Sequence, residues 1–227
     1  MKKITLSILF IASLMHAETP IALSAKVGTL GFGIDVTTNL MPSLNLRANI
    51  NKGKVDFPSQ DSDLTGKGIF ELESAGVLLD YHPFENGFRL SSGLYYSNNK
   101  MDISKSGVEN NILIGKHYYD LTTESKTEFS IDMSGVAPYV GIGWGDSIAE
   151  SKAWSFTVDV GVLYQGSVDA SISMSGSAKE HKSGKKINLK TDKTFLKDVK
   201  AEEYDTAHEM KGLEWYPVLS VGVAYRF

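Results

Sequence analysis

The stretch WYPVLSVGVAYRF, residues 215–227, decides the fold because its side chains alternate in character. Bulky side chains occupy the odd-numbered positions from Trp215 to Phe227, whereas small or polar residues occupy the even-numbered positions from Ser220 onward. Successive side chains of a β-strand point to opposite faces of a sheet. One face of this segment can therefore meet lipid while the other stays polar, which is the repeating unit of a transmembrane β-barrel.

The same alternation recurs along the chain and divides it into strands. It is found in residues 21–27, 32–36, 44–51, 74–82, 88–96, 136–144 and 153–165. Short connectors are expected at residues 38–43, 83–86 and 145–152, and long ones at about 58–68, 102–128 and 170–212. Because bacterial barrels have short periplasmic turns and long external loops, we expect the long connectors outside the cell.

The direction of the last strand supplies the strand count. If this strand runs down to a periplasmic end, the number of strands must be even, which requires a hairpin near the start of the mature chain. A tight turn at Gly28–Gly31 would pair Val27 with Phe32, both facing outward. The same register would pair Lys26 with Gly33, both facing inward. The sequence therefore predicts a first hairpin at this position.

The first 17 residues have the pattern of a secretory signal peptide. Two lysines precede an apolar run, residues 4–15, and the small Ala17 suits cleavage. The other 210 residues form one domain, 18–227, without an apolar run of the roughly 18 residues that a membrane helix needs. We predict an all-β, antiparallel, up-and-down transmembrane β-barrel of eight strands in the outer membrane of a Gram-negative bacterium. The aromatic Phe227 is expected to be recognised by the barrel assembly machinery.

Composition and motifs exclude several functional classes. The formal net charge of −4, about −6 after signal removal, provides no basic footprint for nucleic acid. The chain contains no cysteine, which excludes disulfide and thiolate chemistry. The histidines are scattered without ligand spacing, and no Ser–His pair shares a lipid-facing parity. We therefore expect no metal, no cofactor, no catalytic residue and no enzymatic activity.

The inward parity of the predicted strands is rich in charge. It contains Lys26, Asp35, Arg47, Asp80, His82, Arg89, Tyr95, Tyr139, Asp159, Gln165, Glu214 and Arg226. In one interpretation these charges pair and plug a barrel that is only just wide enough for its own side chains. In the other, Asp35, Asp80 and Asp159 attract a small cationic solute into a narrow polar path with tyrosine walls.

The last long connector, residues 170–212, has two distinct parts. Good helix formers dominate from about Thr194 to Met210, and Phe195 and Val199 fall four residues apart, so we predict a short amphipathic helix. Upstream of it, basic residues cluster at Lys182, Lys185, Lys186 and Lys190. These lysines are interpreted either as solvated surface charge or as a site that meets lipopolysaccharide phosphates at the outer leaflet.

Four motifs together resemble those of the CarO-like outer-membrane proteins. They are KVGTLGFGI at 26–34 followed by the Pro42 turn, YHPF at 81–84, APYVGIG at 137–143 and EWYPV at 214–218. The resemblance extends over most of the mature chain. It implies an eight-stranded, carbapenem-associated barrel with a proposed role in the uptake of ornithine and other small basic amino acids.

Two functional hypotheses follow. The first is a narrow porin-like channel for small polar or cationic solutes such as basic amino acids. The second is a non-conducting structural or interaction barrel, similar in architecture to the OmpA transmembrane domain, whose loops bind lipopolysaccharide or surface partners. Membrane lipid is an expected partner in both cases.

Overall fold

The computed structural model describes residues 20–61, 64–84, 86–148, 153–166, 168–210 and 214–227. The predicted signal peptide, residues 1–17, lies outside the described residues. Within the described part of the chain, no helix is long and apolar enough to cross a membrane.

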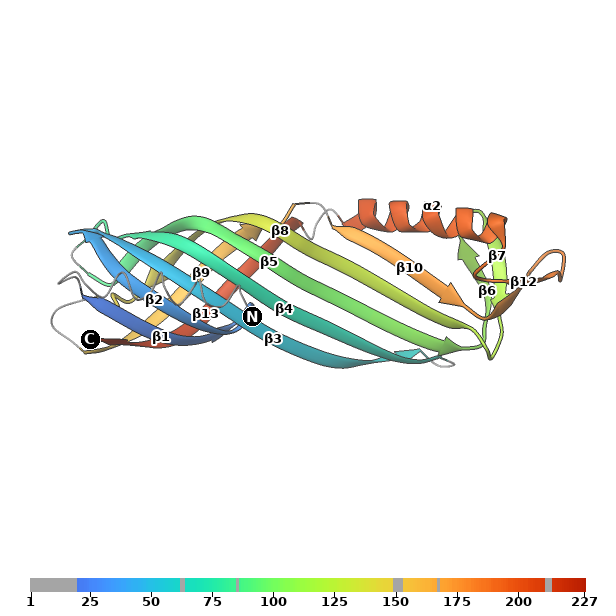
Figure 1. The fold of residues 1–227 in the computed structure, drawn as a ribbon, viewed down its shortest axis with the longest axis horizontal. Helices are drawn as coiled ribbons and strands as arrows, with labels where there is room; N and C mark the ends of the chain where they lie inside the picture. Colours follow the sequence, from blue (N-terminus) through green and yellow to red (C-terminus); the bar gives the residue numbers. More distant parts are fainter. Residues whose placement is uncertain (1–19, 62–63, 85, 149–152, 167, 211–213) are drawn as a thin grey trace, which may run out of the picture.

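Eight antiparallel strands close into a barrel (Figure 1). Around the ring they are β1 (Ile21–Gly28), β2 (Gly31–Met41), β3 (Leu44–Asp61), β4 (Leu64–Tyr81), β5 (Phe88–Gly107), β8 (Lys126–Trp144), β9 (Trp154–Tyr164) and β13 (Trp215–Arg226). Pairing of β13 with β1 completes the ring. The prediction of an eight-stranded up-and-down barrel is confirmed for this ring, and five further described strands lie outside it.

The first hairpin has the predicted register. Val27 of β1 pairs with Phe32 of β2, and both side chains are exposed on the outer wall. Gly31 has a φ of +91°, in the left-handed region that favours glycine. A Cβ atom at this position would also lie 2.5 Å from the carbonyl oxygen of Lys52. The tight turn and the close approach to β3 therefore both require glycine.

The barrel wall is much taller on one side than on the other. The strands β3, β4, β5 and β8 contain 18 to 20 residues, whereas β1, β2, β9 and β13 contain 8 to 12. The long loops predicted at residues 58–68 and 102–128 are wrong for this reason. Strands β3 and β4 reach Asp61 and Leu64, and β5 continues to Gly107.

The outer face of the tall strands changes from apolar to charged part-way along. Ile50, Ala75 and Tyr96 lie side by side in one row of cross-strand pairs and face outward. In the next outward row, Lys52 lies opposite Glu73, and both side chains are exposed. The strands thus continue beyond the lipid-facing band with polar outer faces, so outward apolar parity marks only part of their length.

Aromatic side chains lie at both ends of the apolar band, as in the girdles of membrane barrels. At the end with the short turns, the ring centroids of Trp154 and Tyr225 are 4.8 Å apart. At the other end, those of Tyr164 and Trp215 are 5.0 Å apart. Strand β9, with 11 residues between these two ends, matches the roughly 9–11 residues that a tilted strand needs to cross a bilayer.

Beyond the barrel, the tall wall carries a small subdomain, residues 109–121 and 169–209, which we call the head (Figure 1). Strand β10 (Asp169–Ser175) pairs with the far half of β8. A separate four-stranded sheet contains β12 (Lys186–Asn188), β11 (Ser177–Glu180), β7 (His117–Leu121) and β6 (Glu109–Ile114), in that order. The helix α2 (Lys193–Glu209) confirms the predicted helix. The head therefore replaces most of the predicted final loop with regular structure.

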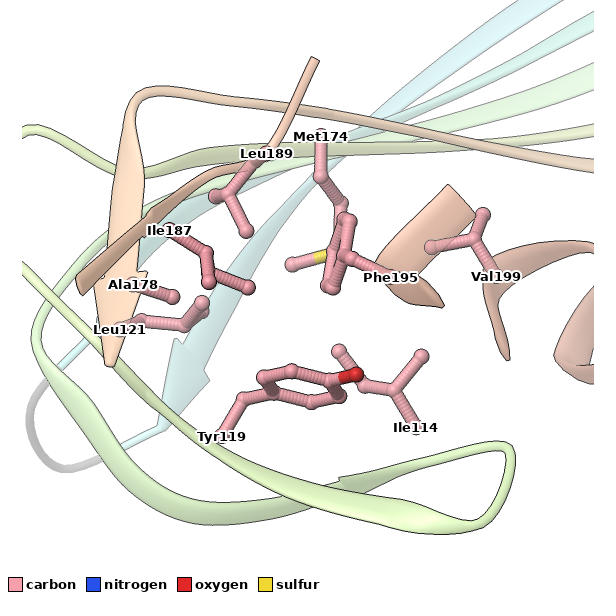
Figure 2. Close-up of a cluster of buried hydrophobic side chains, with 9 residues drawn as sticks. All are labelled: Ile114, Tyr119, Leu121, Met174, Ala178, Ile187, Leu189, Phe195 and Val199. Atoms are coloured by element: carbon pink, nitrogen blue, oxygen red, sulfur yellow. The ribbon is translucent and has the colours of Figure 1, made fainter. Parts of the chain in front are cut away.

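The helix begins at a strong N-cap and buries one stripe. The side chain of Asp192 accepts hydrogen bonds from the backbone N–H groups of Thr194 and Phe195, each at 3.0 Å. Phe195 and Val199 point into an apolar cluster of the head (Figure 2), where Phe195 meets Tyr119 edge-on at 5.1 Å between ring centroids. The head thus has an apolar core of its own.

Candidate functional site: the interior of the barrel

A layer of paired charges crosses the barrel, with Arg47 at its centre. The guanidinium of Arg47 donates from Nη2 to Asp80 Oδ1 at 2.9 Å and from Nη1 to Asp159 Oδ2 at 3.1 Å. Its Nη1 also lies 3.7 Å from Asp35 Oδ2. Arg47 is therefore held by carboxylates from three different strands of the wall.

Two further cations complete this charged layer. Arg89 Nη2 donates to Asp159 Oδ1 at 2.7 Å, and Lys26 Nζ lies 2.7 Å from Asp35 Oδ1. The layer thus contains three cations and three carboxylates, none of whose side chains is more than 7% exposed. Because opposite charges balance, the layer as a whole is neutral.

Glycines on neighbouring strands provide the space that these side chains fill. A Cβ atom at Gly143 would lie 2.8 Å from Arg89 Nε. At Gly161, a Cβ atom would lie 2.6 Å from the hydroxyl oxygen of Tyr139. Inward glycines therefore make room for neighbouring large side chains at these positions.

An apolar and aromatic layer lies next to the charged layer, on the side of the head. Tyr95 and Tyr139 meet edge-on with ring centroids 5.6 Å apart. Around them pack Leu30, Leu78, Ala137, Leu163 and Val218, all of them buried. Side chains from the β1–β2 turn and from β4, β5, β8, β9 and β13 therefore meet across the lumen at this level.

Little space remains on either side of Arg47. One cavity, between Arg47 and Tyr139, has a volume of about 10 Å³. A second, between Arg47 and His82, also has a volume of about 10 Å³. A water molecule needs a cavity of about 10–15 Å³, so each space holds about one water. Within the described residues, this part of the lumen is filled by side chains.

The remaining predicted interior residues lie away from the charged layer. The ring of His82 is 3.2 Å from Asn45 Nδ2 near the short turns, and Gln165 Oε1 accepts from Asn99 Nδ2 at 3.2 Å near the head. Glu214 and Arg226 are half-buried near opposite ends of β13. The structure therefore brings together Lys26, Asp35, Arg47, Asp80, Arg89 and Asp159, with Tyr95 and Tyr139 in the next layer.

Sequence reasoning missed a hydroxyl group that completes the charged layer and an amide group that contacts the aromatic layer. Ser91 Oγ donates to Asp80 Oδ1 at 2.5 Å, and Asn49 Nδ2 donates to the Tyr95 hydroxyl at 3.2 Å. Both residues have the inward parity of their strands. That parity was the available signal, but it could not identify the partners across the barrel.

The four lysines of the predicted lipopolysaccharide site lie in the head. Lys182 and Lys185 are in the turn between β11 and β12, Lys186 is in β12 and Lys190 follows it, and all four are exposed. This turn is at the end of the molecule farthest from the barrel (Figure 1).

Comparison of the sequence with models of protein families and with curated proteins gives no match. The solved structures that match include two CarO proteins. The crystal structure of CarO2 from Acinetobacter baumannii is 20% identical, covers 93% of this chain and 100% of that chain, and superposes with a TM-score of 0.62. CarO from the same organism is 20% identical over 92% of this chain and 98% of that chain, with a TM-score of 0.59.

The chain has the CarO fold. The resemblance predicted from the four motifs is thereby confirmed for this CarO-like barrel. A major outer membrane protein from Thermus thermophilus also matches, with 16% identity over 93% of this chain and 100% of that chain and a TM-score of 0.46.

Proposed function

We propose that this CarO-like barrel is a non-conducting anchor in the outer membrane whose function is exerted by the head. The neutral, paired charge layer carries the proposal. A cationic solute would have to separate carboxylates from Arg47, Arg89 or Lys26, and an unpaired buried ion costs several kcal/mol. The channel hypothesis, uptake of small polar or cationic solutes such as basic amino acids, requires those carboxylates to be available to the solute.

The size of the interior supports the same proposal. The cavities of about 10 Å³ on either side of Arg47 each hold about one water, which is far smaller than an amino acid. The aromatic layer of Tyr95 and Tyr139 stands as a second barrier between the charged layer and the head. A solute would have to displace both layers in turn.

The proposed orientation places the short turns in the periplasm and the head outside the cell. The apolar band between the aromatic rows would lie in the outer membrane, and the charged outer faces that begin at Lys52 and Glu73 would lie in the headgroup region. Export through a cleaved signal peptide and recognition of Phe227 by the assembly machinery belong to this proposal.

Contact between the lysine cluster and lipopolysaccharide stays a prediction, and the height of the head bears on which phosphates the cluster could reach. Tyr96 belongs to the last apolar outward row of the tall strands. From Tyr96 to Gly107, strand β5 has a length of about 36 Å along its axis at 3.3 Å per residue. This length is more than four times the Debye length of about 8 Å. The cluster lies at the end of the head farthest from the barrel (Figure 1). The cluster would therefore meet phosphates that stand well out from the membrane.

Replacing Lys182, Lys185, Lys186 and Lys190 by Gln tests this contact by lipopolysaccharide co-purification. Weaker retention is expected if the cluster binds outlying phosphates. The matched control is Lys52→Gln with Lys54→Gln, next to the apolar boundary. Loss of lipopolysaccharide in the control alone would remove the cluster from the proposal.

Uptake into proteoliposomes tests the proposed function. Vesicles that contain the refolded protein should take up radiolabelled L-ornithine and L-lysine at the rate of protein-free vesicles, while a general porin in parallel vesicles admits both. Saturable uptake of either amino acid that is lost in Asp159→Asn would overturn the proposal in favour of the channel.

A further inference from the structure

The head contains a cavity of about 330 Å³ that the barrel interior does not share. It lies between the tip of the tall sheet (β5, β8 and β10), the β6–β7 hairpin and α2. Its volume is about thirty times that of either cavity beside Arg47 and lies at the lower end of the range of about 300–1,000 Å³ for ligand pockets. The cavity is therefore large enough for a small organic molecule.

The cavity wall is mostly apolar and comes from both sides. Ile103, Phe129, Ile172 and Met174 are contributed by the sheet tip, and Ile112 and Leu121 by the region of the β6–β7 hairpin. Met174 and Leu121 also belong to the apolar cluster of the head (Figure 2). A ligand with an apolar body would replace water that this wall cannot hydrogen-bond.

Polar contacts hold the walls at their present spacing. On the hairpin side, the N–H of Gly115 donates to Glu202 Oε2 at 3.0 Å, and the Tyr119 hydroxyl donates to Asp198 Oδ2 at 2.7 Å. On the sheet side, the N–H of Ile172 donates to Glu203 Oε1 at 2.8 Å. Helix α2 is thus fastened to both walls of the cavity, so the cavity is formed before any ligand arrives.

Burial and the hydrogen bond to Asp198 raise the pKa of the Tyr119 hydroxyl. Because the hydroxyl stays protonated at neutral pH, it can act as the donor in this contact. His117 Nδ1 lies 2.6 Å from the same Asp198 oxygen. Two side chains of β7 therefore converge on one carboxylate of α2, which fixes the hairpin against the helix.

The charged groups of the lining are mainly acidic. Glu202 and Glu109 border the cavity, and Lys105 is the basic residue among its lining side chains. Glu202 uses Oε2 for the Gly115 N–H, so among the described residues its Oε1 is available to a ligand. A carboxylate at the edge of an apolar cavity favours a ligand whose cationic end can form a charge-assisted hydrogen bond.

We infer that this cavity binds a small amphipathic amine, with its apolar body against the sheet tip and its ammonium group at Glu202. The inference rests on the proposed function, which assigns the protein's activity to the head, and it names a ligand class for that head. Conductance and uptake are measured at the barrel, so failure of the head site and failure of the closed barrel are distinguishable.

Methyl NMR of the full-length protein in lipid nanodiscs tests the site directly. The probes are n-octylamine, 1-octanol and octanoate, which share one chain and differ in charge. Titration with n-octylamine should shift the Met174 methyl resonance saturably, with 1-octanol and octanoate at least about tenfold weaker. Met41, which is exposed at the other end of the barrel, serves as the internal control for partition into lipid.

Matched glutamate variants locate the ammonium group. Glu202→Gln keeps an amide oxygen for the Gly115 N–H and should remove the preference for octylamine over octanol. Glu203→Gln makes the same change on the next residue, whose carboxylate bonds Ile172, and should keep the preference. The inference is overturned if Met174 does not respond saturably, if the three probes bind alike, or if the two variants behave alike.

Discussion

The charged layer makes a quantitative prediction for Asp159→Asn. Asp159 lies 2.7 Å from Arg89 Nη2 and 3.1 Å from Arg47 Nη1, and its side chain is 6% exposed. The change keeps the shape of the side chain but leaves three buried cations against two carboxylates. Removing one partner of a buried ion pair costs about 3–5 kcal/mol, so the free energy of unfolding should fall by about that amount.

The assay is reversible urea unfolding of the refolded barrel in lipid vesicles, followed by tryptophan fluorescence. The matched control is Asp56→Asn, whose partner Lys67 lies 3.9 Å away with both side chains more than half exposed. An exposed pair contributes about 0–1 kcal/mol, so this control should change little. Equal effects of the two asparagine substitutions would refute the reasoning.

A double substitution separates lost charge balance from lost packing. Arg89→Gln combined with Asp159→Asn leaves two cations and two carboxylates in the layer. The double variant should lose less stability than the sum of the two single variants, with a coupling of about 1–3 kcal/mol. Strict additivity would mean that the two residues do not act as a pair.

Three further predictions concern packing and the head. Phe195→Ala should destabilise the head by about 3–5 kcal/mol and expose it to protease, while the heat-modifiable gel shift of the barrel is retained. Gly161→Val should cost about 1–3 kcal/mol in urea unfolding, because its Cβ would lie 2.6 Å from the Tyr139 hydroxyl, and an unchanged midpoint would contradict this packing. The hydrogen bond from the Asn111 N–H lowers the pKa of Asp120 in the folded protein. This contact is therefore fully present above about pH 4, the pKa of a free Asp, and is lost as the pH falls through the lower folded pKa. The hydrogen-exchange protection of the Asn111 amide should fall over the same range, and constant protection would argue against the contact.

Much of the barrel could be predicted from parity alone. The alternation in residues 215–227 and the turn at Gly28–Gly31 fix facing and register locally, because a slip of one residue would turn every side chain to the wrong face. The charged inward residues were visible for the same reason. The pairing of Arg47 with Asp80 and Asp159 was not, because it depends on contacts across the lumen between distant strands.

The head was largely missed because its strands lack the lipid-facing signature. Beyond Lys52 and Glu73 both faces of the tall wall meet water or head residues, so outward apolar residues no longer mark a strand. Helix α2 was predicted because the four-residue spacing of Phe195 and Val199 is a local signal. The short strands β11 and β12 have 4 and 3 residues, too few for any periodicity to show.

Single-channel recording in planar lipid bilayers tests the closed barrel most directly. The wild-type protein, inserted at high density, is predicted to give no stepwise conductance. The variant Tyr95→Ala with Tyr139→Ala, which removes the two rings of the aromatic layer, provides the matched control for a lumen that is less filled. Stepwise wild-type currents that are diminished by Asp35→Asn, Asp80→Asn or Asp159→Asn would contradict the account.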